Sequence, residues 1–348
     1  MAIDWGRGYS AEWRAYEVDR GTWADGQQAW DVESASVERT VDGDAPLLEA
    51  GSMSAVVPVG ETWRERYIRL AMVARQGGEV ERVDLCTLLV AAARGNVNRS
   101  RDALELTGRS VLWPASTTKC LPGDYAPALV DGAQWAARAL RRCVAAPVVV
   151  DASFRLSDHT VFPNGTSVLR AVWMVLDAGG CSMRLSGDGT IAICEPPSEP
   201  ALVLDQSAAR LLHPDMPHDL DWSDVPNRYV AHDGTDVAIA TNDDPDSAVS
   251  TASRGYFVDE LDTKPALVGG ESLQAYAQRR LAERSVVADV RTYTREFWPD
   301  VVPGDLVRAS IASVGLDGDM RVTRQSLDCG AGVTVTEEAS MEVSLWTE

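Results

Sequence analysis

The chain has 348 residues, 45% of them hydrophobic, which predicts two to four domains with cores of their own and excludes wholesale disorder. Its 52 acidic and 32 basic residues give a net charge of −20, which excludes stable binding to nucleic acid because an acidic surface repels phosphate. Apolar runs shorter than the ~18 residues of a membrane helix exclude a membrane anchor, and residues 1–7 lack the basic and apolar regions of a signal peptide, so we expect folding in the cytoplasm.

Residues 1–115 have the alternating pattern of short β-strands. The strand-like segments are separated by glycines and comprise residues 12–18, 32–41, 53–58, 67–74, 83–90 and 101–112. Closely spaced strands without a helical pattern favour a small barrel or sandwich. We assign residues 1–115 to a first β-barrel domain.

Residues 116–218 predict an α+β domain. Apolar residues recur at helical spacing in 131–145, which Asp131 can cap, and in 166–178, which Gly179-Gly180 ends. Two strand-like segments then flank a strong turn signal, Ser186-Gly187-Asp188-Gly189. A brief strand at 148–150 and a short helix at 207–213 complete the set.

Residues 219–348 return to a β pattern. A hairpin is expected at 227–241 around His232-Asp233-Gly234, and later strands at 286–294, 306–314, 319–327 and 332–345. Between them lies a helical stripe at 271–283. We interpret residues 219–247 and 286–348 as a second β-barrel that is interrupted by a small α+β insertion, 248–285. The expected fold class is therefore multidomain β plus α+β, with two small β-barrel domains and an α+β domain between them.

Three segments in the last third of the chain carry a family resemblance. They are residues 225–230 (VPNRYV), the helix at 271–284, and residues 302–310 (VPGDLVRAS), in that order after a β and then an α+β half. This order resembles the tail hub, or baseplate hub, proteins of tailed bacteriophages, and the likeness extends over almost the whole chain. Many hubs carry a long C-terminal extension, whereas residue 348 directly follows a strand here, so host binding and wall cleavage are expected to fall to other proteins.

The resemblance implies a structural virion protein at the tail tip. Three copies would form a ring in which the two barrels of each copy occupy six positions, so that a threefold tip matches the sixfold tail tube or distal tail ring. The implied partners are two further copies of the chain, a distal tail or tail tube protein, the tape-measure protein, and a central fibre or other tip protein. DNA would pass only transiently through the channel during genome ejection. We expect part of the negative excess of residues 219–348 to lie on the channel wall.

Residues that could carry chemistry do not form a site in the sequence. The four histidines, His159, His213, His218 and His232, lack a common zinc spacing and are interpreted as loop residues in solvent. The acidic segment 242–246 lacks the Gly and distant Glu of a calcium loop, and Asp317-Gly318-Asp319 is interpreted as a hairpin turn. Asn164-Gly165-Thr166 is interpreted as a turn and helix cap. Six separated cysteines predict free thiols: Cys86, Cys120, Cys143, Cys181, Cys194 and Cys329.

The sequence also lacks a nucleophile elbow, a phosphate-binding loop and a dinucleotide fingerprint. We therefore expect no enzyme activity, no catalytic residue, no cofactor and no metal. The alternative function is a carbohydrate- or receptor-binding module or a cell-wall hydrolase at the same tail tip, because acidic pairs are abundant and eleven tryptophans are present. Those tryptophans are scattered, which favours core and interface positions over a sugar-binding strip.

Overall fold

The computed structural model describes residues 3–41, 48–57, 64–98, 101–205, 216–263, 265, 271–312, 316–330 and 333–346. The chain is mostly β with few helices, as the sequence predicts. It divides into two compact units: unit 1 contains Met1–Met216 and Thr292–Ala339, and unit 2 contains Pro217–Arg291 and Ser340–Glu348. The finer division into five domain ranges with two barrels stays a prediction.

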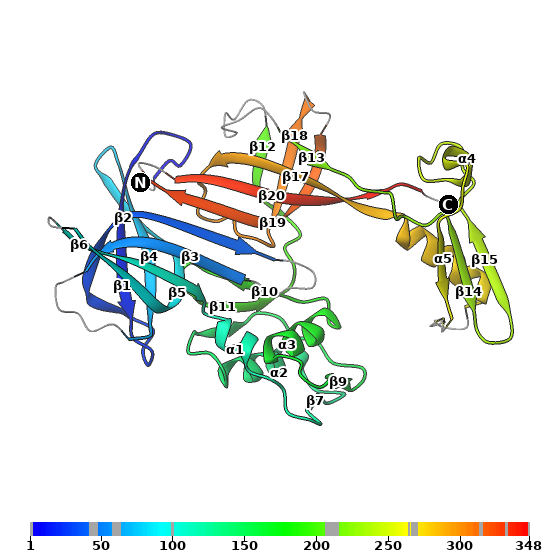
Figure 1. Cartoon of the computed structure of the whole chain (residues 1–348), viewed down its shortest axis with the longest axis horizontal. Helices are drawn as coiled ribbons and strands as arrows, with labels where there is room; N and C mark the ends of the chain where they lie inside the picture. Colours follow the sequence, from blue (N-terminus) through cyan, green and yellow to red (C-terminus); the bar gives the residue numbers. More distant parts are fainter. Residues whose placement is uncertain are drawn as a thin grey trace. The chain divides into compact units, whose positions relative to one another are not determined.

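The first six strands of unit 1 pair in a closed antiparallel circuit (Figure 1). β1 pairs with β2 and β4, β4 with β5, β5 with β6, β6 with β3, and β3 with β2. A closed circuit leaves no free strand edge inside it and encloses one core. The bounds are β1 (Ser10–Val18), β2 (Asp25–Thr40), β3 (Leu48–Val56), β4 (Arg66–Gln76), β5 (Glu79–Asn98) and β6 (Arg101–Ser110).

The two faces of these strands are buried against different neighbours. Alternate residues of β4, namely Ile68, Leu70 and Met72, join the core of the circuit. Tyr67 of the same strand, with Leu89 of β5, joins a second apolar cluster with the helical segment that follows. Because side chains alternate across a strand, β4 is covered on both sides, which explains its nearly continuous apolar sequence.

The helical segment of unit 1 contains both predicted helices in shortened form. Its elements are α1 (Trp113–Thr117), β7 (Tyr125–Ala126), α2 (Gly132–Arg141), β8 (Val148–Val150), β9 (Thr160–Val161), α3 (Val168–Asp177), β10 (Ser182–Leu185) and β11 (Ile191–Cys194). The expected cap of α2 is confirmed, since the Asp131 carboxylate accepts a hydrogen bond from the Gln134 N–H. The β10–β11 hairpin is also confirmed. The helix expected at 207–213 lies outside the described residues.

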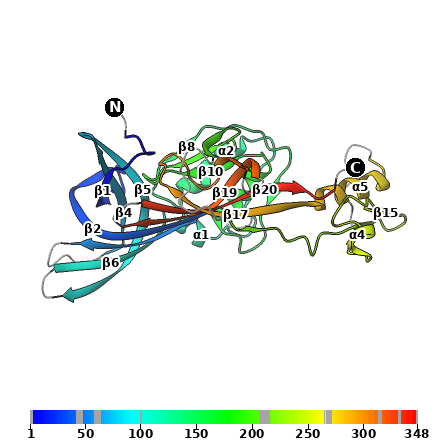
Figure 2. The same ribbon diagram turned by 90° about the horizontal axis from the view of Figure 1, so that it is seen from above.

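Strand β19 joins the first circuit to the later strands. Its first half, Leu316 to Arg321, pairs with β18, and its second half, Arg324 to Cys329, pairs with β2. β20 and β17 continue the sheet beyond β19, as Figure 2 shows, and β12 pairs with β18 in parallel. The bounds are β12 (Pro200–Asp205), β13 (His218–Asp219), β17 (Val286–Glu296), β18 (Leu306–Ile311), β19 (Leu316–Cys329) and β20 (Val333–Ser344).

The pairing of β18 with β19 corrects the interpretation of Asp317-Gly318-Asp319 as a turn. Ile311 pairs with Leu316, so the strand has already begun when the chain reaches Asp317. Arg308 of β18 forms ion pairs with the carboxylates of Asp317 and Asp319 at 2.7 and 3.3 Å. The two acids are thus cross-strand partners of one arginine, which is a favourable pairing for strand residues.

Unit 2 contains a three-stranded sheet with one helix on it. Its elements are β14 (Arg228–His232), β15 (Val237–Thr241), α4 (Thr251–Arg254), β16 (Asp259–Asp262) and α5 (Leu273–Arg284). The hairpin expected at 227–241 is confirmed as β14–β15, but it pairs with β16 of the predicted insertion in a sheet of its own. Small residues on one face of the hairpin let α5 pack against it, because Ala231, Ala238 and Ala240 form one cluster with Tyr276, Ala277 and Leu281 of α5.

Replacement of Gly108 by Ala tests the close packing inside the circuit. A Cβ at Gly108 would lie 2.6 Å from Leu88 Cβ and 3.0 Å from Val90 Cγ2, so the core must shift to admit it. We expect Gly108→Ala to lower the free energy of unfolding by about 1–3 kcal/mol in urea denaturation. Gly8→Ala is the matched control, because nothing lies within 4 Å of its Cβ position. Equal stability of the two variants would contradict this packing.

Candidate functional site

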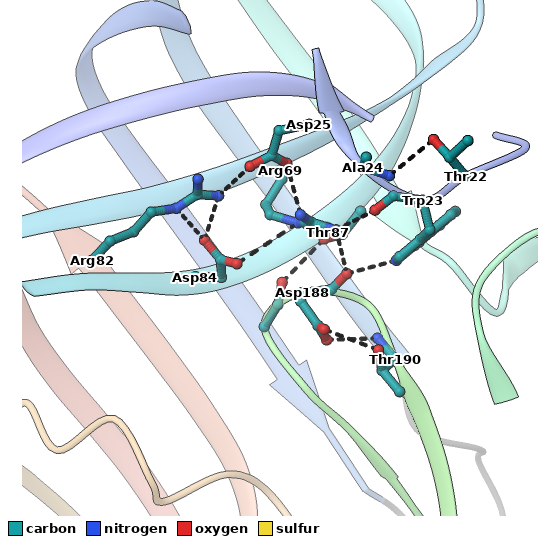
Figure 3. A network of polar contacts seen from close by, with 11 residues as sticks. Thr22, Trp23, Ala24, Asp25, Arg69, Arg82, Asp84, Thr87, Asp188 and Thr190 are labelled. Carbon is teal, nitrogen blue, oxygen red and sulfur yellow. Dashed lines mark hydrogen bonds and ion pairs between the residues drawn. The ribbon is translucent and has the colours of Figure 1, made fainter. Parts of the chain in front are cut away.

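Arg69 of β4 is the centre of a polar network between the first circuit and the β10–β11 turn (Figure 3). Its side chain is 8% exposed. Its Nη1 donates to Asp25 Oδ1 at 2.7 Å, and its Nη2 donates to the backbone oxygen of Asp188 at 2.9 Å. Its Nε donates to Thr87 Oγ1 at 3.2 Å. One guanidinium therefore binds the start of β2, β5 and the hairpin turn at once. We call this network the barrel joint.

Two further side chains hold the turn in the barrel joint. The Trp23 indole N–H donates to the backbone oxygen of Asp188 at 2.8 Å, and the Thr87 hydroxyl donates to the backbone oxygen of Gly187 at 3.1 Å. Trp23 itself has a φ of 58°, which is uncommon for a bulky residue. The turn is thus bound through its backbone carbonyls by side chains of the first circuit.

The glycines of this turn are required by the close approach of the two segments. A Cβ at Gly187 would lie 1.8 Å from the backbone oxygen of Asp84, and Gly189 has a φ of 83°. Both positions exclude a side chain, one by contact and one by backbone conformation. The turn signal seen in the sequence therefore serves a long-range contact as well as the hairpin.

The charges of the barrel joint alternate and compensate one another. Arg82 forms ion pairs at 2.7 Å with both Asp25 and Asp84, so that two carboxylates lie between two guanidinium groups. Burial by itself would lower the pKa of Arg82, but its hydrogen bonds to Asp25 and Asp84 raise it. With its charges compensated in this way, the arrangement binds β2, β4, β5 and the β10–β11 turn to one another.

A second network of polar side chains lies across the junction of β2 and β19. Arg39 Nε donates to Glu49 Oε1 at 2.9 Å, and Gln325 Nε2 donates to Glu337 Oε1 at 2.5 Å. Arg295 donates to both oxygens of Glu337, at 2.7 and 2.5 Å. A 3.5 Å contact from Arg39 Nη1 to Gln325 Oε1 links the two halves. We call these five residues the buried polar chain.

Burial makes the buried polar chain costly unless its groups are paired. The side chains of Arg295 and Glu337 are 1% and 0% exposed, and that of Glu49 is 2% exposed. Glu49 Oε2 has no hydrogen-bond partner among the described residues. Burial raises the pKa of Glu49 to about 7, although the charge and hydrogen bond of Arg39 act in the opposite direction. The surroundings of Glu49 thus keep its carboxyl protonated at pH values well above the ordinary pKa of 4.5.

The segment 302–310, which carried part of the family resemblance, forms a third polar contact within unit 1. Asp305 is 3% exposed, and its Oδ2 accepts hydrogen bonds from the Val302 N–H at 2.9 Å and from Arg184 Nη2 at 2.8 Å. Burial raises the pKa of Asp305 against these two contacts. Gly304 has a φ of 99°, which explains the Pro303-Gly304 pair before the strand. The motif thus connects the start of β18 to strand β10.

The residues considered for metal binding are not brought together. Among the described residues, no group of three acids, histidines or cysteines could hold a metal ion. His159 is an exposed loop residue whose Nδ1 accepts a hydrogen bond from the Ala128 N–H, as expected of a loop histidine. His218 and His232 belong to β13 and β14, so their assignment to loops was wrong. His213 lies outside the described residues.

The acidic segment 242–246 is held by its own side chains. Asn242 is fully buried and donates to Ser247 Oγ at 2.9 Å, while its Oδ1 accepts from the Asp244 N–H at 3.2 Å. Asp243 and Asp246 are exposed, which agrees with the solvated loop that the sequence favours. The six cysteines are free thiols, also as expected.

The sequence interpretation did not identify the residues of the two networks. Arg69 lies within a run of buried residues in β4, whereas Arg295 and Gln325 occupy buried positions of β17 and β19. A charged residue at a position that should be buried is the available signal, because such a residue needs a partner. That signal indicates a network but does not identify the partner.

Comparison with solved structures finds the same fold along nearly the whole chain. A tail protein from Neisseria meningitidis MC58 is similar with a TM-score of 0.63 at 14% identity, over 96% of this chain and 97% of that chain. The 43 kDa tail protein of prophage MuSo2 from Shewanella oneidensis is similar with a TM-score of 0.63 at 13% identity, over 96% and 98% of the two chains. The chain has the fold of phage tail proteins.

This similarity concerns the fold, because the identities are low. No protein-family model and no curated protein matches the sequence. Among the described residues of this tail-protein fold, no helix is long and apolar enough to cross a membrane.

Replacement of Arg69 by Met tests the barrel joint. Loss of the guanidinium leaves the carboxylate of Asp25 and the carbonyl of Asp188 with fewer donors, so we expect the free energy of unfolding to fall by about 3 kcal/mol. Arg75→Met on the same strand is the matched control, because Arg75 is 49% exposed and lies 3.6 Å from Glu12. Its effect should stay within about 0.5 kcal/mol. Similar losses in the two variants would show that Arg69 has no special role.

Replacement of Glu49 by Gln tests the buried polar chain through pH. The pKa of Glu49 is raised from 4.5 to about 7 in the folded protein. Protonation of Glu49 therefore stabilises the folded protein fully below pH 4.5, and this stabilisation is lost as the pH rises through 7. Gln cannot ionise. We therefore expect the stability of Glu49→Gln relative to the unsubstituted protein to increase between pH 5 and pH 8, by on the order of 1 kcal/mol or more. Denaturation at several pH values measures this difference, and a difference independent of pH would contradict it.

Proposed function

We propose that this chain is a structural virion protein that acts as a homotrimeric hub at the tip of a phage tail. The observation that carries the proposal is the agreement of the fold with two tail proteins over at least 96% of all three chains. A likeness of this extent covers both the first circuit and the later strands, rather than one common domain. The low identity makes it a likeness of architecture, so the trimeric role is our inference.

The strand pairing supports a hub with two β-rich parts in each copy. The first half of β19 pairs with β18 and its second half pairs with β2 of the first circuit. The first circuit and the later strands therefore share one strand. Three such copies would provide six β-rich positions around a threefold axis, which matches a sixfold tail tube or distal tail ring. The second closed barrel that the sequence predicts belongs to this proposal.

The charge of the chain supports a passage for DNA rather than a DNA-binding site. Residues 219–348 contain 24 acidic and 11 basic residues, and a wall with this excess would repel phosphate. We propose that the ring lines the DNA channel and binds a distal tail or tail tube protein, the tape-measure protein and a central fibre or other tip protein. The function is that of an assembly part and not of an enzyme, because the polar networks bind chain segments to one another.

The mass of the purified protein in solution tests the hub. Light scattering after size-exclusion chromatography should give three times the chain mass of 37.6 kDa. A parallel assay with peptidoglycan and tail-receptor polysaccharides should give neither binding nor cleavage. A monomer that binds or cleaves polysaccharide would contradict the hub and favour a receptor-binding module or hydrolase.

A further inference from the structure

The sheet of unit 2 has one covered face and one apolar, exposed face. The covered face contains Tyr229 and Ala231, which pack on α5. On the opposite face, the register places Val230 directly between Ile239 of β15 and Leu261 of β16. Ile239 is 51% and Leu261 is 65% exposed. A row of apolar side chains across three strands is thus in contact with solvent in the single chain.

One aromatic residue and one compensated ion pair extend this face. Phe257 lies two residues before β16 and is 55% exposed. The Arg228 guanidinium lies 3.9 Å from the centre of the Phe257 ring and donates two hydrogen bonds of 2.6 Å to Asp259. The charges on the face are therefore paired with each other. Contiguous apolar surface of this kind is typical of sites where proteins associate. We call it the unit 2 face.

A second group of exposed apolar side chains lies in unit 1 around the β7–β9 pair. Tyr125 and Val161 are directly opposite each other in this pair and are 48% and 68% exposed. Leu121 precedes the pair and Leu129 follows β7, with exposures of 71% and 64%. Leu129 also has a φ of 65°, a backbone conformation that is unfavourable for a bulky residue. Burial of the Leu129 side chain does not offset this cost in the single chain, because the side chain is exposed. We call this group the β7–β9 surface.

The two surfaces belong to parts of the chain that differ in charge, one strongly acidic and the other nearly neutral. Unit 2, residues 217–291 and 340–348, contains 16 acidic and 7 basic residues, a net charge of −9. Residues 113–194, which carry the β7–β9 surface, contain 6 acidic and 7 basic residues, a net charge of +1. Two copies of unit 2 would repel each other, whereas unit 2 and the β7–β9 segment would not. Charge therefore favours contact between the two different surfaces.

We propose that the unit 2 face of one copy docks on the β7–β9 surface of the next copy. A closed ring of identical chains needs such a pair of different, complementary surfaces, since a surface that binds its own copy produces a twofold dimer. The occupant of the unit 2 face is thus a second copy of this chain. This inference rests on the proposed homotrimer and adds the surfaces that close it.

Single substitutions on each surface test the contact. Ile239→Lys on the unit 2 face and Val161→Lys on the β7–β9 surface each place a charge in an apolar contact. Each variant should raise the protein concentration at half assembly by at least about tenfold, so that it elutes as a monomer where the unsubstituted protein is a trimer. Val80→Lys is the matched control, because Val80 is 56% exposed and lies on neither surface. Circular dichroism checks that all three variants fold.

A mixture of the two variants separates a specific contact from general destabilisation. Ile239→Lys keeps its β7–β9 surface and Val161→Lys keeps its unit 2 face, so one intact contact can form between them. The equimolar mixture should therefore give a heterodimer of twice 37.6 kDa, while each variant alone stays at 37.6 kDa. Variants that stay trimeric like Val80→Lys, or a mixture that stays monomeric, would overturn the docking and leave the trimeric hub in place. A monomeric unsubstituted protein would overturn the hub and this contact together.

Discussion

The pairing of β2 with β19 is the interaction on which the rest of unit 1 depends. Residues far apart in the chain meet there, since Cys329 pairs with Ala35 and Arg324 with Thr40. The buried polar chain crosses this pairing from Glu49 to Arg295, so a shift of register by one residue would move Gln325 to the other face and leave buried charges without partners. Strand pairing and polar contacts thus specify the same register.

The polar networks fix the joints between segments, whereas the apolar clusters supply most of the stability. Apolar burial is proportional to area and has little directionality, so it tolerates small shifts of one segment over another. Hydrogen bonds from Arg69 to the backbone of the 186–189 turn, and from Arg184 to Asp305, require a defined geometry. The trimeric ring that we propose would need this kind of rigidity, because an error at each joint would be repeated in every copy.

Local features of the fold could be predicted from the sequence, and long-range pairings could not. The Asp131 cap of α2 and the β10–β11 hairpin depend on residues near one another in the chain. The helix cap expected at Asn164-Gly165-Thr166 was wrong, because the N-cap of α3 is Ser167, whose side chain accepts a hydrogen bond from the Arg170 N–H. β2 begins at Asp25, earlier than expected, because the polar residues after it are paired with β1 rather than buried. The partner of the β14–β15 hairpin and the partners of Arg69 depend on tertiary contacts that a pattern of alternation does not encode.

Electron cryomicroscopy of the purified assembly tests the ring most directly. Our interpretation predicts three copies around a channel, with six β-rich lobes that alternate between the β1–β6 circuit and the β17–β20 strands. The β2–β19 pairing should join the two lobes of each copy. A ring of another order, or a channel lined by only one β-rich part of each copy, would contradict it.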